Sequence, residues 1–301
     1  MTTTLATPRR RRKRSLFAAI GLLPFLVFSL ALAAYPLSQV VRMAFSEIDL
    51  GATGFSYSWS GLDNLVRVLS DASAWQAIGN TVFFVVMTVV GSLLMGLIAA
   101  LLVNRAVILL PLARNVMIWP AVIAPVVVSL MWLLIFSPTV GGINKVALSF
   151  GLPAQEWLNS GPGAMFVVII VDIWHWTPVV FLFLYTALQS INEEVLEAGR
   201  MDGANEVGLL RHIVLPLLVP AIAAVGVVRI VMGIKVFDEM YLLTSGGPNG
   251  ATTLVSQRIQ LWFFQDLRFG DASAFSLAVV LMTAIVLAAF LFARRQLGKR
   301  A

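Results

Sequence analysis

The chain has 301 residues, of which 59% are hydrophobic and 12% charged, and its mean hydropathy is +0.90. Soluble domains carry about 25% charged residues. A soluble fold of this length could not bury so much apolar surface, so we expect a lipid bilayer to cover part of it. The absence of cysteine excludes disulfides, thiolate metal sites and cysteine nucleophiles. The net charge of +6 comes mostly from basic residues beside hydrophobic segments, which favours a membrane surface and not nucleic acid as the partner.

The chain begins with a basic segment, residues 1–15, which contains Arg9–Arg14. The apolar run after it resembles a secretory signal. However, that run extends from Ser15 to Val41 and ends without a small-residue cleavage site, so a retained first transmembrane helix is predicted over residues 16–42. An extracytoplasmic loop is expected over residues 43–76.

Residues 77–293 are predicted to form the core membrane domain, because five more stretches approach the roughly 20 apolar residues that a spanning helix needs. The six predicted spans are Leu16–Val41, Ala77–Val103, Asn115–Phe136, Ala164–Leu188, Ile213–Ile234 and Ala272–Ala293. Pro120 and Pro125 interrupt the third span, where ordinary kinks are favoured over a gating hinge. A basic tail, residues 294–301, ends the chain.

The basic residues indicate the orientation of these spans. If the N-terminus is inside, the two basic termini and the segments 105–114 and 200–211 hold most of the 21 Lys and Arg residues. Cytoplasmic segments carry such an excess, so both termini are expected in the cytoplasm. The sequence therefore predicts an all-α polytopic membrane protein with six transmembrane helices.

The connection between the fourth and fifth spans, residues 190–216, is rich in charged and turn-forming residues. Asn192 is a predicted N-cap, followed by acidic residues in the first helical turn. Asp202-Gly203 is a turn signal, and Asn205 is expected to cap a second short helix before Pro216 returns the chain to the membrane. The pattern predicts two short helices joined by a turn.

Without further information this connection is a solvated hairpin in which Glu197 pairs with Arg200. Its spacing, however, resembles the cytoplasmic EAA signature of permease subunits of binding-protein-dependent ABC importers. The residues that carry the resemblance are Glu197, Ala198, Gly199, Asp202, Gly203, Ile213, Leu215 and Pro216. Two departures are Gly199 in place of a second alanine and the absence of an aromatic residue in 207–210.

The resemblance implies the type I ABC importer permease fold, with this loop seated as a coupling helix in a cleft of the ATPase subunit. Glu197 would then pair with a basic residue of the ATPase, Ala198 and Gly199 would permit close approach, and Asp202 and Gly203 would set the bend. The sequence has no Gly-x4-Gly-Lys-Ser/Thr motif, so ATP and Mg are expected on the ATPase and no cofactor in this chain. The implied partners are a second homologous permease subunit, two ATPase subunits and an extracytoplasmic solute-binding protein.

Segments outside the loop resemble the carbohydrate branch of the family, the maltose and glycerol-3-phosphate importer type. They include Tyr35-Pro36, Gly61–Asn64 and Lys235–Pro248. This resemblance implies uptake of a sugar or related polyol, such as a disaccharide, an oligosaccharide or a glycerophosphate-type solute, across the cell membrane of a prokaryote. The outer segment Ser245–Gly250 is either a contact for the binding protein or an ordinary surface turn.

Ionisable residues within the fourth span are candidates for the solute pathway. Asp172 and His175 share a helix face at i,i+3, with Trp174, Trp176 and Tyr185 nearby. Aromatic faces can stack on sugar rings, while a carboxylate and an imidazole can hydrogen-bond hydroxyls. The alternative, which their position favours, is that both groups lie near the outer end of the span, hydrated or paired, beside an interfacial belt of tryptophans.

Arg229 lies within the fifth span and has two interpretations. It could bind an anionic solute, or it could pair with an acidic group of a partner subunit, and the structural pair is favoured. Neither interpretation requires a metal or a catalytic residue.

The sequence is less consistent with two other functions. An ATP-independent channel or secondary carrier for small polar solutes would be expected to show inverted repeats and a chain of intramembrane carboxylates, and neither occurs in the sequence. An intramembrane enzyme could use Asp172 and His175 as acid and base, but no nucleophile or metal cluster accompanies them. The sequence therefore predicts a non-enzymatic transport subunit.

Overall fold

The structure is a computed structural model that describes residues 10–51, 54–105 and 110–297. Residues 1–9 of the predicted basic N-terminal segment and residues 298–301 of the predicted tail lie outside the described residues. Helices make up most of the described chain. They are α1 (Arg10–Ala44), α2 (Asp63–Ser70), α3 (Ala72–Arg105), α4 (Leu110–Val122), α5 (Pro125–Ile135), α6 (Gly142–Ser149), α7 (Gly161–Gln189), α8 (Glu193–Met201), α9 (Glu206–Leu209), α10 (Leu215–Ile234), α11 (Asp238–Thr244), α12 (Val255–Gln260) and α13 (Phe269–Leu297), with π-helical segments at Leu210–Val214 and Leu261–Gln265.

Five helical stretches in the described part of the chain are long and apolar enough to cross a membrane. They are Gly21–Ala44, Ala72–Asn104, Gly161–Gln189, Glu206–Ile234 and Phe269–Ala288. These stretches cover five of the six predicted spans. The predicted third span is wrong as a single helix, because it is divided into α4 and α5.

The division lies just before Pro125, at the first turn of α5. Ala124 is extended, with φ −60° and ψ 139°, and the backbone N–H of Val127 bonds to the carbonyl of Ala124 at 2.9 Å. Proline has no N–H and restricts the residue before it, so an uninterrupted helix is disfavoured here. The carbonyl of Ile123 is consequently left without its helical partner. The proline signal was correct in position, but its effect is a full break and not a kink.

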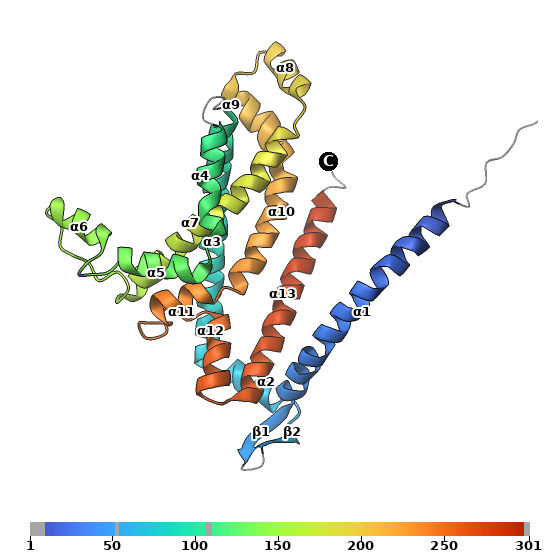
Figure 1. The fold of residues 1–301 in the computed structure, drawn as a ribbon, viewed down its shortest axis with the longest axis vertical. Coiled ribbons are helices and arrows are strands. Elements are labelled where there is room, and N and C mark those ends of the chain that lie inside the picture. Colours follow the sequence, from blue (N-terminus) through green and yellow to red (C-terminus); the bar gives the residue numbers. More distant parts are fainter. Residues whose placement is uncertain (1–9, 52–53, 106–109, 298–301) are drawn as a thin grey trace, which may run out of the picture.

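Two ends of the bundle can be distinguished in Figure 1. The first turns of α1 and the last turns of α13 point toward the end that carries α8, whereas α2 and the two strands lie at the opposite end. The central helices α3 and α7 pack along each other, and α10 packs on both. A side chain at Gly96 of α3 would place its Cβ 2.6 Å from Val180, so glycine allows the close approach of α3 to α7. We call these two ends the α8 end and the hairpin end.

The strands are a departure from the predicted all-α fold. β1 (Ser46–Gly51) and β2 (Gly54–Trp59) form an antiparallel hairpin within the predicted loop 43–76, with Ser46 opposite Trp59. Aromatic and aliphatic residues alternate with polar ones along both strands, which is the pattern of a sheet with two unlike faces. The alternation in the sequence therefore indicates two strands within the predicted loop.

α1 contributes little to the core of this chain. The side chains of α1 from Gly21 to Leu37 are almost all exposed, and they include large apolar residues such as Phe25 and Phe28. The helix contacts α13 and the strand β1. An apolar helix with so little cover from its own chain needs lipid or another protein around it.

Candidate functional site

A buried cluster of charged side chains lies between α3, α7 and α10. Asp172 on α7 accepts a hydrogen bond from the Arg229 guanidinium on α10, and Nε of Arg229 donates to Oγ of Ser92 on α3 at 3.2 Å. All three residues are buried. An isolated charge in a membrane span is costly, and pairing Asp172 with Arg229 removes most of that cost.

His175, one turn after Asp172, forms the second pair. Its Nδ1 lies 2.6 Å from Oε1 of Glu239 on α11, and its Nε2 lies 3.2 Å from the carbonyl oxygen of Ile123. A carbonyl only accepts, so Nε2 carries a hydrogen. The bond between Nδ1 and Glu239 then requires a further proton, held by the imidazole or by the carboxyl group. The Ile123 carbonyl is the one that the break between α4 and α5 leaves without a helical hydrogen bond, and His175 supplies its partner.

These contacts decide between the interpretations of the sequence. Asp172 and His175 were predicted to be hydrated or paired, and the structure shows them paired and about 1% exposed. Arg229 forms a structural pair, as favoured, and its acidic partner is Asp172 of its own chain. Glu239, the partner of His175, was not selected from the sequence, since it lies 64 residues away with no local signal.

The predicted aromatic residues separate into three environments. Trp174 packs edge-on against Trp132 of α5, with ring centres 5.5 Å apart, within the apolar core. Trp176 lies under the Arg229 guanidinium, 5.8 Å from its ring centre. Tyr185 stacks on Phe181 and accepts a hydrogen bond from Gln189, about 20 Å further along α7 from Asp172 at 1.5 Å per residue. The structure therefore brings only Trp176 to the charged cluster.

A polar pocket of about 260 Å³ opens beside Trp176. It is lined by Pro125, Trp176, Met232, Lys235, Val236, Phe237, Asp238 and Glu239. Oε2 of Glu239 is buried and has no hydrogen-bond partner among the described residues. The pocket thus combines aromatic surface with an ammonium and two carboxyl groups, one of which has an oxygen without a hydrogen-bond partner.

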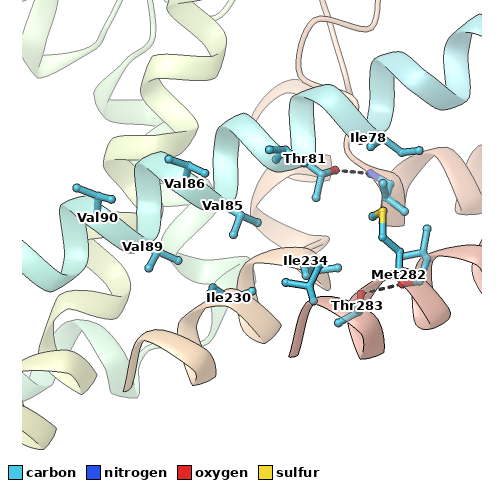
Figure 2. A pocket seen from close by; sticks show the side chains of 14 residues that line it. Ile78, Thr81, Val85, Val86, Val89, Val90, Ile230, Ile234, Met282 and Thr283 are labelled. Carbon is cyan, nitrogen blue, oxygen red and sulfur yellow. Dashed lines mark hydrogen bonds between the residues drawn. The ribbon is translucent and has the colours of Figure 1, made fainter. Parts of the chain in front are cut away.

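A second pocket, of about 400 Å³, lies between α3, α10 and α13 and has a different chemistry. Figure 2 shows its valine and isoleucine side chains on α3 and α10, with Met282 and Thr283 on α13. Its two hydroxyl groups are already used: Thr81 donates to Ala77 and accepts from the Val255 amide, and Thr283 donates to Val279. This pocket offers nothing that a polar solute could bind.

The predicted turn signals of the 190–216 loop are confirmed. The side chain of Asn192 accepts from the Glu194 amide at 3.1 Å and caps α8, and Asn205 accepts from the Gly208 amide at 2.8 Å and caps α9. Gly203 follows α8 with φ +84°, the left-handed conformation that favours glycine. The Ala204 amide bonds to the Gly199 carbonyl and the Gly203 amide to the Arg200 carbonyl, which is the Schellman arrangement.

Gly199 and Ile213 hold α8 against the next helix. A Cβ at Gly199 would lie 2.6 Å from Cδ1 of Ile213 and 2.7 Å from Cδ2 of Leu209, so the missing side chain lets α8 close on its own chain. Gly199 therefore faces the next helix of its own chain. Glu197 and Ala198 are exposed.

Two further expectations for the loop are corrected. Arg200 lies 3.5 Å from Glu206, in place of the predicted pair with Glu197. The second short helix does not end before the membrane, because α9, the π-helical segment and α10 form one helix over Glu206–Ile234. Leu215 and Pro216 lie inside this continuous helix, directly after the π-helical segment, where the proline can donate no backbone hydrogen bond.

The segment Ser245–Gly250 is a loop, as predicted. Ser245 and Asn249 have positive φ, and the hydroxyl of Thr252 donates to the Gly247 carbonyl at 2.8 Å. The amide of Asn80 on α3 donates to the Gly250 carbonyl at 3.0 Å, which fixes the loop to the bundle. The loop is therefore an ordered feature.

A bundle of long apolar helices, with a charged cluster buried inside it and a capped helix projecting from one end, is typical of a multi-pass membrane protein. Residues 92–301 match the family described as binding-protein-dependent transport system inner membrane component. The chain belongs to this family.

Similar proteins narrow this assignment. The chain is 30% identical to the trehalose/maltose transport system permease protein MalF of Thermococcus litoralis over 79% of each chain. It is 32% identical to the sn-glycerol-3-phosphate transport system permease protein UgpA of Escherichia coli O6:K15:H31, over 87% of this chain and 88% of that protein. The chain is therefore a permease subunit of an ABC importer in the cell membrane, as its sequence predicted.

A solved structure confirms the importer permease fold. A chain in the crystal structure of a bacterial alginate ABC transporter, in complex with an alginate pentasaccharide-bound periplasmic protein, superposes with a TM-score of 0.80. The match covers 95% of this chain and 96% of that chain at 22% sequence identity. At this identity the likeness concerns the fold alone.

Proposed function

We propose that this permease imports a neutral sugar or polyol, and that a separate ATPase subunit drives it by docking on α8. The observation that carries the proposal is α8 itself. It is closed on its own chain through Gly199, while Glu197 and Ala198 remain exposed. No phosphate-binding Gly-x4-Gly-Lys-Ser/Thr motif occurs in the sequence, which supports a motor on another chain.

The contacts of α8 suggest how motion would be transmitted. Leu209 and Ile213 touch the Gly199 face of α8 and belong to the helix that continues to Ile234. That helix carries Arg229, which is bonded to α7 and α3. Force applied to Glu197 would therefore reach three helices of the bundle without passing through a flexible segment.

The orientation in the membrane follows from this proposal. An ATPase is cytoplasmic, so the α8 end would face the cytoplasm, with the beginning of α1 and the end of α13 on the same side (Figure 1). The concentration of Lys and Arg at both termini supports this arrangement. Six crossings would then require α4 and α5 together to cover the bilayer thickness.

The hairpin end would face the solute-binding protein. We propose the Ser245–Gly250 loop as one of its contacts, because it is ordered by Thr252 and Asn80. A second homologous permease and two ATPase subunits would complete the transporter.

The pocket beside Trp176 is the proposed solute contact. Trp176 and Phe237 offer rings on which a sugar can stack, and the exposed side chains of Lys235 and Asp238 can hydrogen-bond its hydroxyl groups. Lys235 and Asp238 have opposite charges, and the charge of Glu239 is balanced by the proton it shares with His175. A neutral solute therefore suits the pocket better than an anion, and Arg229 is already neutralised by Asp172.

The relatives support a carbohydrate-type solute. The names of the two similar permeases specify trehalose or maltose for one and sn-glycerol-3-phosphate for the other. Between these two chemistries, the balanced charges of the pocket favour the uncharged sugar.

The test is transport by the purified complex in proteoliposomes, with neighbouring tryptophans as a matched pair. Trp176→Ala should raise the KM for the solute, and this effect is measured separately from any loss of stability, because the Trp176 ring also packs on Arg229 and His175. Trp174→Ala, which opens a hole beside Trp132, should lower stability by about 3–5 kcal/mol. Uptake that proceeds without ATP, with this chain alone in the membrane, would contradict the proposal and favour a channel or carrier.

A further inference from the structure

The β1–β2 hairpin has two chemically different faces. The register places Ile48 opposite Tyr57 and Leu50 opposite Phe55, and Trp59 follows on the same face. Because side chains alternate along a strand, the other face carries different residues. The cross-strand pairs on that face are Glu47 with Ser58 and Asp49 with Ser56. We call the two faces of the hairpin the aromatic face and the acidic face.

The aromatic face is only partly covered by this chain. Trp59 stacks on Phe45 with ring centres 5.8 Å apart, and Phe55 packs edge-on against Phe269 of α13 at 5.4 Å. Even so, Trp59 remains 78% exposed and Phe55 54% exposed. These two residues leave a large aromatic surface without cover from the described chain.

The position of the hairpin indicates what covers that surface. β1 begins at Ser46, two residues after α1 ends at Ala44, so the hairpin starts where an apolar spanning helix leaves the bilayer. Arg42, in the last turn of α1, lies with its guanidinium 4.1 Å from the ring centre of Tyr57. Arginine, tyrosine and tryptophan at the end of a span are typical of the headgroup region.

The hairpin is held in a fixed direction relative to α1. The buried side chain of Asn64, on α2, donates to the carbonyls of Ala44 at 3.0 Å and Ser46 at 2.8 Å. The amide of Ser60 donates to the carbonyl of Phe45 at 3.0 Å, which joins the far end of β2 to the same junction. The orientation of the aromatic face is therefore set by the bundle.

We infer that the hairpin lies on the lipid bilayer, with its aromatic face in the headgroup and upper acyl region and its acidic face in water. The lipid-facing surface of α1 leads directly into the aromatic face, so one continuous apolar surface would contact lipid. Glu47 and Asp49 would be unfavourable in that layer, and the alternation directs both away from it. The hairpin would fix the height of α1 and α13 in the membrane at this end.

The test uses the absence of cysteine from this chain, so that each introduced cysteine is the only one in it. Cysteine would be introduced by Phe55→Cys and Trp59→Cys on the aromatic face, and by Ser56→Cys and Ser58→Cys on the acidic face of the same strand. Each variant would be spin-labelled within the complete transporter, in nanodiscs of phosphatidylethanolamine and phosphatidylglycerol. The measurement is the collision of each label with oxygen, which concentrates in lipid, and with a water-soluble nickel complex.

Labels at 55 and 59 should favour oxygen, and labels at 56 and 58 should favour nickel, so the preference alternates along the strand. Equal access of nickel to both faces would overturn the inference, because the hairpin would then project into water. Exclusion of both reagents from 55 and 59 would also overturn it, because a protein partner would then cover that face. If Trp59→Cys disturbs the packing on Phe45, the pair of Phe55→Cys and Ser56→Cys still decides between the outcomes. None of these results depends on the identity of the solute or on transport activity.

Discussion

The buried cluster around Asp172 and the exposed helix α8 both concentrate charge in a chain with few charged residues. They differ in whether those charges are paired within the chain or exposed to solvent. In the cluster, Asp172 meets Arg229 and His175 meets Glu239, all within one chain. On α8, Glu197 is exposed to solvent. Charge inside a membrane must be compensated where it stands, so the cluster is first a requirement of folding. Charge in water has no such requirement and can be used to bind another protein.

The strongest way to test this contrast is to remove one member of the buried pair. Arg229→Leu leaves the carboxyl group of Asp172 buried without its partner, and we expect a loss of about 3–5 kcal/mol in the free energy of unfolding. Denaturant titration of the purified chain in mixed micelles would measure it.

The control for this prediction removes both charges. The double variant Asp172→Leu with Arg229→Leu should regain most of the lost stability, because no uncompensated charge remains. Ser92 keeps a partner in both variants, since its hydroxyl donates to the Val89 carbonyl at 3.2 Å. If Arg229→Leu were as stable as the wild type, the cluster would not be a folding requirement.

A smaller effect is expected where α8 ends. Gly203 has φ +84°, so Gly203→Ala should cost about 1–2 kcal/mol and loosen the Schellman turn. The hydrogen exchange of the Ala204 amide, which bonds to the Gly199 carbonyl at 3.0 Å, should become about 5–30 times faster. Gly79→Ala is the matched control: Gly79 is helical, with open space around its Cβ position, and this change should be neutral or mildly stabilising. Equal effects of the two substitutions would show that the left-handed turn is not what the glycine supplies.

These two regions also differ in how far the sequence predicted them. The caps Asn192 and Asn205 and the turn at Gly203 act on amides two or three residues away, so a local pattern contains the whole interaction. The partners in the cluster come from distant helices, and nothing beside His175 in the sequence indicates Glu239. The break at Pro125 is a similar case. It leaves the Ile123 carbonyl without a helical hydrogen bond, and the residue that bonds to this carbonyl, His175, lies 52 residues later in the chain.

The hairpin was missed for another reason. Its alternating pattern is short and lies between two strong helix signals. Its stability also depends on contacts that the pattern does not contain, such as those of Phe55 with Phe269 and of Asn64 with the end of α1. Spans can be found from composition, whereas such small connecting structures require knowledge of what packs on them.

The ion pair between Asp71 and Arg268 at the hairpin end is partly exposed, so its exposure lies between that of the buried cluster and that of α8. Burial opposes the charge of Asp71, but hydrogen bonds from the Ser73 hydroxyl and amide and from Arg268 outweigh it and lower the pKa of Asp71 below its usual 3.8. A lowered pKa in the folded state contributes stability above the unfolded value, and that contribution is lost as pH falls through the folded pKa. Asp71→Asn should therefore cost less than about 1 kcal/mol at pH 7. The difference between variant and wild type should shrink below about pH 4, in thermal unfolding measured at several pH values. A difference that did not depend on pH would mean that packing of the side chain, and not its charge, is responsible.

The smallest change in stability is expected on α8, together with the largest change in function. Glu197 is exposed, so Glu197→Lys should change the free energy of unfolding by no more than about 0.5 kcal/mol. If Glu197 faces a basic residue of the ATPase, reversing its charge should reduce solute-stimulated ATP hydrolysis by about tenfold or more, the equivalent of 1.4 kcal/mol of docking energy. Glu193→Lys on the same helix is the control. It removes a carboxylate from the first turn, where the helix dipole favours it, and should cost about as much stability or more while leaving hydrolysis coupled. If the two variants are equally stable but only Glu197→Lys reduces solute-stimulated hydrolysis, the coupling role belongs to the position of Glu197. If hydrolysis stays coupled to the solute in both variants, α8 is an ordinary solvated helix.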